Sequence, residues 1–325
     1  AKFKPFHPWL LANGDLIVKD DHTPLLRFDG CGRKVWRQDG ALFHPSTASD
    51  GAEGLWIPSV IEPATVSGVP PTFQEDALTH VTFDGRILAQ ISVPQMLLRH
   101  DLAYLLFPPG KYNDDPLHLN DIQPVLADGP YWKKGDLFVS LRRSSTVLLY
   151  RPETDDIIWM KSGPWLGQHD VDILDDHRIA IYDNRAENRG AKISGGSSEI
   201  MVYDFATGAV SRPYADAMAR EQVFSYYEGL YTILPGGALV IEDHNSGRIL
   251  ILAADGQKLG QFINRNKNGK VYQIGWGRYV TQADGDVALK ALDALDCGGQ
   301  PARSEERRVG KECEVPCRSR WSPYH

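Results

Sequence analysis

Two stretches of this chain can be laid over each other, and the match extends through three consecutive β-type runs. The first stretch comprises His118 to Val125, Gly135 to Arg142 and Thr146 to Tyr150. The second comprises His169 to Leu174, Arg178 to Asn184 and Glu199 to Tyr203. In both, a histidine opens an apolar run and the second run ends in a polar residue. This repetition predicts a fold assembled from copies of one small β-sheet.

Three further units fit the same template less closely. They begin at His7, at His44 and at Glu228, where a glutamate takes the place of the histidine. A sixth and weaker unit spans Val271 to Leu292. Units of about 40 residues have the length of a β-propeller blade. The sequence therefore predicts an all-β, six-bladed β-propeller over residues 1–297, of which five blades can be counted directly.

Local signals agree with an all-β chain. Runs rich in Val, Ile, Leu, Tyr and Phe are separated by Asn-Gly, Asp-Gly and Gly-Gly turns. Short helices are expected only in Pro94 to Leu106 and Pro213 to Gln222, both between blades. An apolar content of 42% is enough to fill the cores between radially packed sheets.

Charge and hydropathy exclude some classes of partner. A net charge of −7 argues against nucleic acid, which needs a concentrated basic surface. No apolar run approaches the ~18 residues of a membrane span, so no integral membrane segment is expected. The chain starts at Ala1 without an apolar leader, which indicates a mature form or a fragment and leaves the compartment unknown.

The end of the chain differs from the rest. From Gly298 the strand alternation stops and charged residues dominate, so residues 298–325 are predicted to be a disordered or non-native tail. Cys31 stands alone, whereas Cys297, Cys313 and Cys317 lie at the far end. A disulfide among the last three is allowed but not favoured, and the Cys313–Cys317 pair lacks a second ligand pair for zinc.

Residues at equivalent blade positions should converge at one mouth of the central channel. The expected set joins the starts of the first strands to the ends of the second strands: His44, His118, Asn120, His169 and Glu228, with Arg142, Asn184 and Glu242. Arg185 and Arg189 follow in a loop. Imidazoles combined with guanidiniums suit an oxyanion. No metal or cofactor is expected, although Asn120, Asn184 and Glu228 are an alternative set of calcium ligands.

Five motifs between His118 and Asn184 carry a family resemblance: His-Leu-Asn-Asp, Gly-Asp-Leu-Phe-Val-Ser-Leu-Arg, Ile-Ile-Trp, Gln-His-Asp and Tyr-Asp-Asn. They resemble the core of the arylsulfate sulfotransferase family. The resemblance implies a six-bladed propeller that moves a sulfuryl group from an aryl sulfate to a phenol through a sulfohistidine, without a nucleotide donor. It also implies a periplasmic or other extracytoplasmic location. His118, His169 and an arginine of the Arg185 to Arg189 loop would bind the sulfate.

The chain departs from the family pattern at the nucleophile. Where the family has a histidine after a Gly-Gly-small-apolar run, Gly236 to Leu239 is followed here by Val240, and the nearest histidine is His244. The nucleophile is then His244, His118 or His169, or it is missing. Glu228 and Glu242 are candidates for the acid and base that handle the phenol proton. If the nucleophile is missing, the alternative is a non-catalytic propeller that binds an anionic ligand, a glycan or a partner protein. Trp132 and Trp165, in loops, are candidates to border a phenolic ligand.

Overall fold

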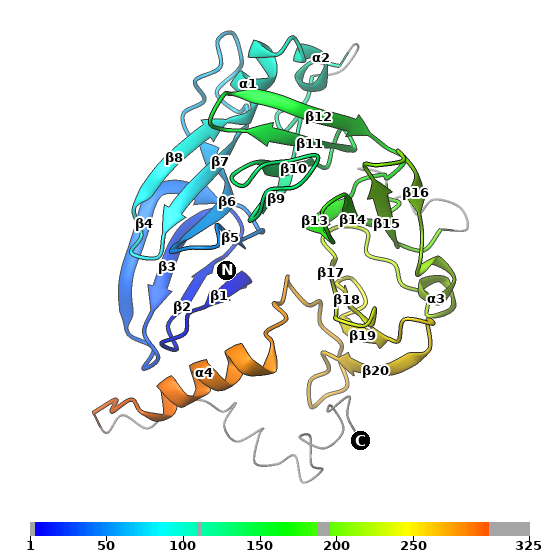
Figure 1. Cartoon of the computed structure of the whole chain (residues 1–325). Helices are drawn as coiled ribbons and strands as arrows, with labels where there is room; N and C mark the ends of the chain where they lie inside the picture. The colour runs from blue at the N-terminus through cyan, green and yellow to red at the C-terminus, as the bar shows by residue number, and fades with distance from the viewer. Residues whose placement is uncertain (1–3, 109–111, 187–195, 299–325) are drawn as a thin grey trace.

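Antiparallel strands arranged around a central axis dominate the computed structural model, which describes residues 4–108, 112–186 and 196–298. The first eight strands form one sheet: β1 (Phe6–Leu10), β2 (Leu16–Lys19), β3 (Thr23–Phe28), β4 (Lys34–Phe43), β5 (Ala48–Ser49), β6 (Gly54–Ile61), β7 (Glu75–Thr82) and β8 (Ile87–Ser92). Figure 1 shows that β1 and β5 both lie near the axis, so this sheet supplies two blades that stay joined through β4 and β6.

Three four-stranded sheets complete the β structure of the described residues. They are β9 (Leu119–Pro124) to β12 (Asp156–Ser162), β13 (His169–Ile173) to β16 (Val210–Ser211), and β17 (Leu230–Ile233) to β20 (Lys258–Ile263). Their middle strands are β10 (Leu137–Leu141), β11 (Thr146–Arg151), β14 (Arg178–Asp183), β15 (Glu199–Asp204), β18 (Leu239–Asp243) and β19 (Arg248–Leu252). The prediction of a β-propeller built from the repeated units is confirmed, with β9, β13 and β17 innermost (Figure 1).

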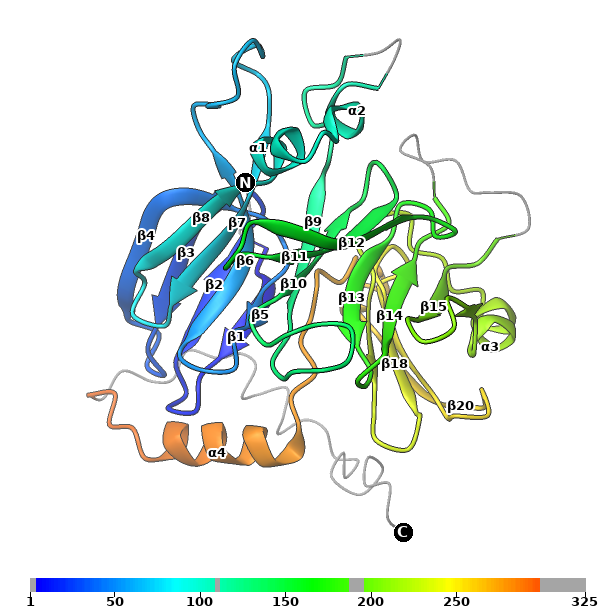
Figure 2. The ribbon, with the colours of Figure 1, turned by 45° about the horizontal axis from the view of Figure 1, so that its top comes forward.

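The helices lie outside the blades. α1 (Val93–Arg99) and α2 (Ala103–Leu106) fall in the first segment predicted to be helical, and α3 (Ala215–Arg220) falls in the second. Seen from a second direction, α3 lies at the outer side of β15, whereas α1 lies above β7 and β9 (Figure 2). Among the described residues, no helix is long and apolar enough to span a membrane.

The weak sixth unit does not form strands. Within Val271 to Leu292 the structure has an irregular segment and then α4 (Gln282–Asp293), and a single bridge between Arg265 and Val271 is its β pairing. The Oγ1 atom of Thr281 accepts the Asp284 backbone N–H, which is the N-cap that starts this helix. A total of six blades therefore stays a prediction. Of the predicted tail, residues 298–325, all but Gly298 lie outside the described residues.

Neighbouring blades are joined by buried carboxylates as well as by apolar cores. Asp76 accepts the backbone N–H of Leu119 at 2.9 Å, Asp121 that of Val171 at 2.8 Å, and Asp170 that of Tyr231 at 2.9 Å. Each bond links one blade to the innermost strand of the next. All three carboxylates are buried, and a buried N–H without a partner is costly. The bonds therefore fix the spacing of the inner strands.

The irregular segment after β20 returns to the first blade. It lies between the first and the last blade and contacts both. The Trp276 carbonyl accepts the His7 backbone N–H at 2.8 Å. The Arg278 guanidinium donates to the carbonyls of Pro8 and Thr47, and it stacks over the Trp9 ring. On the other side, the Gly277 N–H donates to the Glu242 carboxylate at 2.6 Å. This segment ties the last blade to the first.

A disulfide connects the turn between β3 and β4 to the end of the described chain. Cys31 and Cys297 are bonded across 266 residues of sequence, so the view of Cys31 as an isolated cysteine was wrong. The sequence separation concealed the pair, because ring closure is what brings the ends together. α4 adds packing at the same place, since Leu292 lies over Gly14 and Gly30. Cys313 and Cys317 lie outside the described residues.

Replacing Cys31 by serine should lower the free energy of unfolding by about 2–4 kcal/mol, because the cross-link limits the entropy of the unfolded chain. Urea denaturation of the oxidised protein measures the change. Cys297→Ser should give the same loss and the double variant no further loss. Equal stability of the wild type and Cys31→Ser in oxidising buffer would contradict the prediction.

Glu242 should make stability depend on pH. Burial raises the pKa of its carboxyl from 4.5 to about 7 in the folded protein. Between these two values the folded state holds a proton that the unfolded state has released. The contribution of Glu242 to stability is thus greatest below pH 4.5 and falls by up to about 3 kcal/mol as the pH rises to 7.

Glu242→Gln should flatten that fall, because the amide oxygen still accepts the Gly277 N–H but does not ionise. The comparison is made by denaturant unfolding at pH 5 and pH 8. Glu221→Gln is the matched control, since Glu221 pairs with Lys258 at the surface and should leave the slope unchanged. If Glu242→Gln keeps the slope of the wild type, the buried carboxyl is not its source.

Candidate functional site

A cavity of about 340 Å³ opens where the inner ends of the blades meet. Six of the residues predicted from the repeats line it: His44, His118, Asn120, Arg142, His169 and Glu228. Its aromatic lining consists of Phe6, Tyr226, Tyr227 and Trp276. Asp21 and His22 complete its polar wall. The repeat pattern thus located the cavity correctly, whereas the aromatic residues and the Asp21–His22 turn were not expected there.

His118 is held by a single carboxylate. Asp115 accepts the backbone N–H of His118 at 3.0 Å with one oxygen and the ring Nδ1–H at 2.6 Å with the other. Because an ionised carboxylate can only accept, Nδ1 carries a proton, and no described residue hydrogen-bonds to Nε2. Arg143 also donates to Asp115, at 2.8 Å. Burial alone would raise the pKa of Asp115, but the bonds and charges of His118 and Arg143 lower it below its ordinary value.

His118 also has an unusual backbone. Its φ is +52°, in the left-handed region that residues with a side chain seldom adopt. The Asp115 turn stabilises this conformation, because it satisfies the His118 N–H locally. The side chain is 37% exposed, so it reaches the cavity instead of packing into the sheet. Strained residues of this kind often occur at functional sites.

His169 has no free nitrogen. Its Nδ1–H donates to Asn184 Oδ1 at 2.7 Å, and its Nε2 accepts the Glu228 backbone N–H at 3.2 Å. Burial, and then the charge of Arg142, lower the pKa of His169 well below 6.5. The ring is therefore neutral and fully hydrogen-bonded. It links its own blade to the next and leaves no lone pair for a substrate.

His118 and His169 differ in exposure because they occupy different positions relative to the strand pairing of β9 and β13. In β9, Leu119 pairs with Leu141 and a bulge follows at Asn120; in β13, His169 itself pairs with Tyr182 and the bulge follows at Asp170. His169 thus matches Leu119, and the alignment of the two histidines was wrong by one residue. Since one residue decides the face of a strand, His118 precedes its strand and is accessible, whereas His169 lies within one.

The residue expected at the end of the second strand was wrong in the last blade. The residues that follow β10, β14 and β18 are Arg142, Asn184 and His244. Glu242, which was expected at this position in the last blade, lies inside β18 and accepts Gly277 from outside the cavity lining. β18 is longer than the alignment assumed, because its pairing with β19 runs to Asp243 and Arg248.

Arg142 and Asn184 have different tasks. Arg142 lines the cavity, is 7% exposed and interacts with Tyr226. Asn184 lies behind the wall, where its amide donates to the carbonyls of Ser225 and Glu228. Asn120 donates to the Gln168 carbonyl at 2.7 Å, and its buried Oδ1 has no hydrogen-bond partner among the described residues. Arg142 and Asn120 can therefore contact a ligand, and Asn184 positions His169.

His244 lies behind Glu228. It is fully buried and is not among the cavity-lining residues. Its Nδ1 is 2.7 Å from Glu228 Oε2 and also contacts the Ile274 carbonyl. Both neighbours are acceptors, so Nδ1 carries the proton. Glu228 in turn lines the cavity and lies 3.6 Å from the Lys4 ammonium. His244 can hold Glu228 in place but does not reach the cavity that His118 lines.

The remaining predicted residues lie elsewhere. Arg185 pairs with Glu199 and is not among the cavity-lining residues. Arg189 lies outside the described residues. Trp132 and Trp165 are buried together in the apolar core between two blades, so the idea that they border a ligand was wrong. Their loops fold back onto the sheets, a tertiary contact that loop position in the sequence does not reveal.

Comparison with solved structures shows likeness of fold. A protein of unknown function from Bacteroides caccae matches with a TM-score of 0.50 and 11% identity, over 80% of this chain and 82% of that one. Virginiamycin B lyase from Staphylococcus aureus matches with a TM-score of 0.45 and 13% identity, over 80% and 70% of the two chains. A streptogramin B lyase matches with a TM-score of 0.46 and 10% identity, over 85% and 84%.

Sequence comparison identifies the family. No curated protein matches the chain significantly. The family model described as arylsulfotransferase (ASST) matches residues 7–265, which include the five blades and every cavity-lining residue of the predicted set. With most of its length matched, the chain belongs to the arylsulfotransferase family.

Proposed function

We propose that this protein transfers a sulfuryl group from an aryl sulfate ester to a phenol, with Nε2 of His118 as the nucleophile. The observation that carries the proposal is the His118–Asp115 pair, which leaves one imidazole lone pair facing a cavity. Membership of the arylsulfotransferase family supports the reaction class. An extracytoplasmic location is part of the proposal, since the Cys31–Cys297 disulfide suits an oxidising compartment.

His118 is preferred to the other two histidines because of their hydrogen bonds. Nε2 of His169 already accepts the Glu228 N–H. His244 is fully buried behind Glu228. Only His118 combines a protonated Nδ1, a free Nε2 lone pair and exposure to the cavity. A neutral imidazole of this kind is a competent nucleophile near pH 7.

The cavity also fits the two halves of an aryl sulfate. Phe6, Tyr226, Tyr227 and Trp276 offer aromatic surface for the ring of the ester. The Arg142 guanidinium and Asn120, whose buried Oδ1 has no hydrogen-bond partner among the described residues, lie in the same wall. Arg142 is placed to neutralise charge on the sulfuryl oxygens, and guanidinium donors in a partly buried site stabilise such charge strongly.

In the first half-reaction Nε2 of His118 attacks sulfur, an N–S bond forms and the S–O bond to the aryl group breaks. The aryl group leaves as a phenolate, and the Asp115 carboxylate balances the positive charge on the sulfated imidazole. In the second half-reaction the Glu228 carboxylate accepts the proton of the acceptor phenol while the phenol oxygen attacks sulfur and the N–S bond breaks. Glu228 then releases this proton to solvent, from which the first phenolate regains one. The two steps give ping-pong kinetics.

His118→Gln should lower acceptor-dependent release of nitrophenol from a nitrophenyl sulfate by at least about 1,000-fold, because the nucleophile is lost. Intact mass measured after donor alone should show one sulfuryl group on the wild type and none on the variant. His177→Gln, which changes a histidine on a surface turn, is the control and should keep both signals. An adduct that persists in His118→Gln would name another nucleophile, and no adduct with any donor would favour a propeller that only binds ligands.

Asp115→Asn should slow formation of the adduct by about 100-fold while donor affinity stays unchanged, since the charge that balances the sulfated ring is removed. Rapid-quench mass spectrometry gives the rate, and the donor concentration dependence gives the affinity. Asp114→Asn is the matched control, because Asp114 binds Thr72 and not His118. Equal rates for the two variants would argue that Asp115 only stabilises the fold, which thermal melting checks separately.

A further inference from the structure

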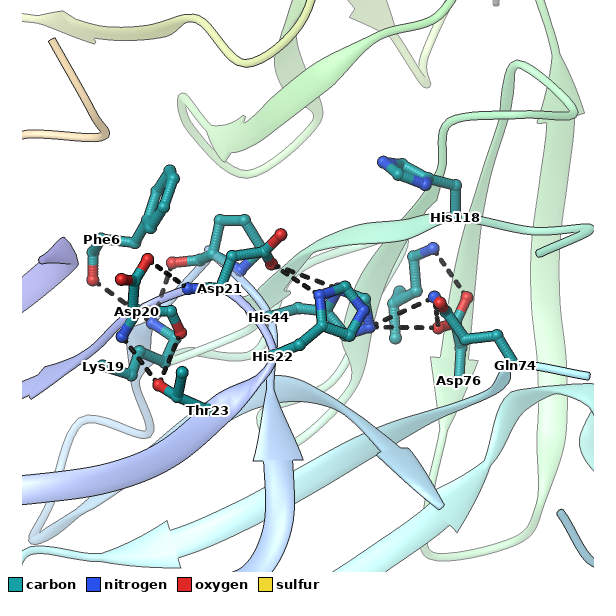
Figure 3. Close-up of polar contacts among 12 residues, drawn as sticks. Phe6, Lys19, Asp20, Asp21, His22, Thr23, His44, Gln74, Asp76 and His118 are labelled. Atoms are coloured by element: carbon teal, nitrogen blue, oxygen red, sulfur yellow. Dashed lines mark hydrogen bonds and ion pairs between the residues drawn. The ribbon is translucent and has the colours of Figure 1, made fainter. Parts of the chain in front are cut away.

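Three potential metal ligands converge in the cavity wall, in a cluster that the proposed sulfuryl transfer does not use. Nδ1 of His22 lies 3.1 Å from Asp21 Oδ1, and Nδ1 of His44 lies 4.0 Å from the same oxygen. The three ligand atoms all lie within 4.8 Å of one another. Figure 3 shows the two imidazole rings between Asp21 on one side and Gln74 and Asp76 on the other.

The backbone holds both histidines in place. The His22 N–H donates to the Phe43 carbonyl at 2.9 Å. His44, which follows Phe43 in the sequence, donates its N–H to the Pro58 carbonyl at 2.8 Å. His22 has a φ of +53° in the turn between β2 and β3. The hydrogen bond from His22 to Phe43 thus holds the β2–β3 turn beside the end of β4. This arrangement brings the two rings to a centroid distance of 4.1 Å.

A second layer of polar groups orients the His44 ring. Nε2 of His44 lies 3.4 Å from Asp76 Oδ1. The Gln74 amide nitrogen, also 3.4 Å from this Nε2, donates to the same Asp76 oxygen at 3.0 Å. Asp76 is itself fully buried and anchored by the Leu119 N–H. Metal-binding histidines commonly donate their second ring N–H to a carboxylate, which fixes the tautomer and leaves the other nitrogen for the metal. Here that other nitrogen is Nδ1, on the side of Asp21.

We propose that Asp21, His22 and His44 bind a divalent transition-metal ion, with zinc as the best match, through two imidazole nitrogens and one carboxylate oxygen. Zinc takes this donor set with bonds of about 2.0–2.1 Å, which puts tetrahedral ligand atoms roughly 3.3 Å apart. The 3.1 Å separation is already close to this value, whereas the 4.0 Å separation and the third one, which is within 4.8 Å, must shorten when the ion binds. The ion takes the place of the proton between His22 and Asp21.

The site leaves a coordination position for an exogenous ligand. Asp21 and His22 both line the cavity, and their side chains are 46% and 40% exposed. Three protein ligands and an open position are typical of zinc sites that bind or activate a small molecule. The ligand chemistry that fits is an anionic oxygen, such as that of a sulfate or a phenolate. The inference goes beyond the proposed sulfuryl transfer and depends only on the geometry of this cluster.

Zinc binding to the chelator-treated full chain, followed by calorimetry, tests the site directly. We expect one tight site, and at least about 100-fold weaker binding in Asp21→Asn and in His44→Ala. The chain supplies a matched control in Asp175, Asp176 and His177, an acidic and histidine-containing group on an outer turn. His177→Gln should leave the affinity within about twofold. Because Asp21 is half-exposed, Asp21→Asn should stay folded even if His44→Ala does not, as thermal melting will show.

Cobalt gives a second, spectroscopic readout. Co²⁺ added in place of zinc should give visible absorption bands of a low-coordinate nitrogen and oxygen site, and these bands should vanish in Asp21→Asn. Sulfate or phenol should shift them if the open position faces the cavity. The proposal is overturned if the wild type binds no zinc, if Asp21→Asn binds as tightly as the wild type, or if neither sulfate nor phenol alters the cobalt spectrum. None of these measurements needs sulfuryl transfer, so the two proposals can fail separately.

Discussion

The cavity depends on the buried carboxylates that bind the inner strand of the next blade. Asp76, Asp121 and Asp170 accept the N–H groups of Leu119, Val171 and Tyr231. Each of these N–H groups lies within three residues of His118, His169 or Glu228 in the sequence. A blade that moved outward would leave both a buried N–H and a buried carboxylate without a partner, which is more costly than a loss of apolar packing alone. The spacing of the cavity wall is therefore set by hydrogen bonds and not only by side-chain volume.

Backbone conformation helps three side chains of the wall to reach the cavity. His22, His118 and Glu228 all have a positive φ, and all three line the cavity. This conformation turns a residue away from the alternation of its strand, so its side chain can leave the sheet. The cost is offset locally, as Asp115 does for His118 and the Phe43 carbonyl does for His22. His169 has no such turn and stays within the sheet, where its two nitrogens join two blades.

Ring closure and the cavity share one segment of chain. Trp276 contributes aromatic surface to the cavity, while its carbonyl holds the first blade through His7. Arg278, two residues later, is half-buried near Asp121, Asp170 and Asp172 and donates to carbonyls of the first two blades. Burial lowers the pKa of Arg278 to about 10, and the three carboxyls work against that shift. The segment thus joins the last blade to the first and completes the aromatic wall, with the Cys31–Cys297 disulfide beyond it.

The sequence by itself determined the repeated blades, because the alternation of apolar residues and the turn residues act over a few neighbours. It also determined that His44, His118, Arg142, His169 and Glu228 share one mouth. Only the tertiary structure decided their roles. A bulge one residue away makes His118 accessible and His169 buried, and the length of β18 puts His244 behind Glu228. The pairing of Cys31 with Cys297 and the meeting of Asp21, His22 and His44 depend on ring closure and on strand pairing between distant segments. Such contacts leave no periodic signal in the sequence, since each partner satisfies its local pattern equally well without the other.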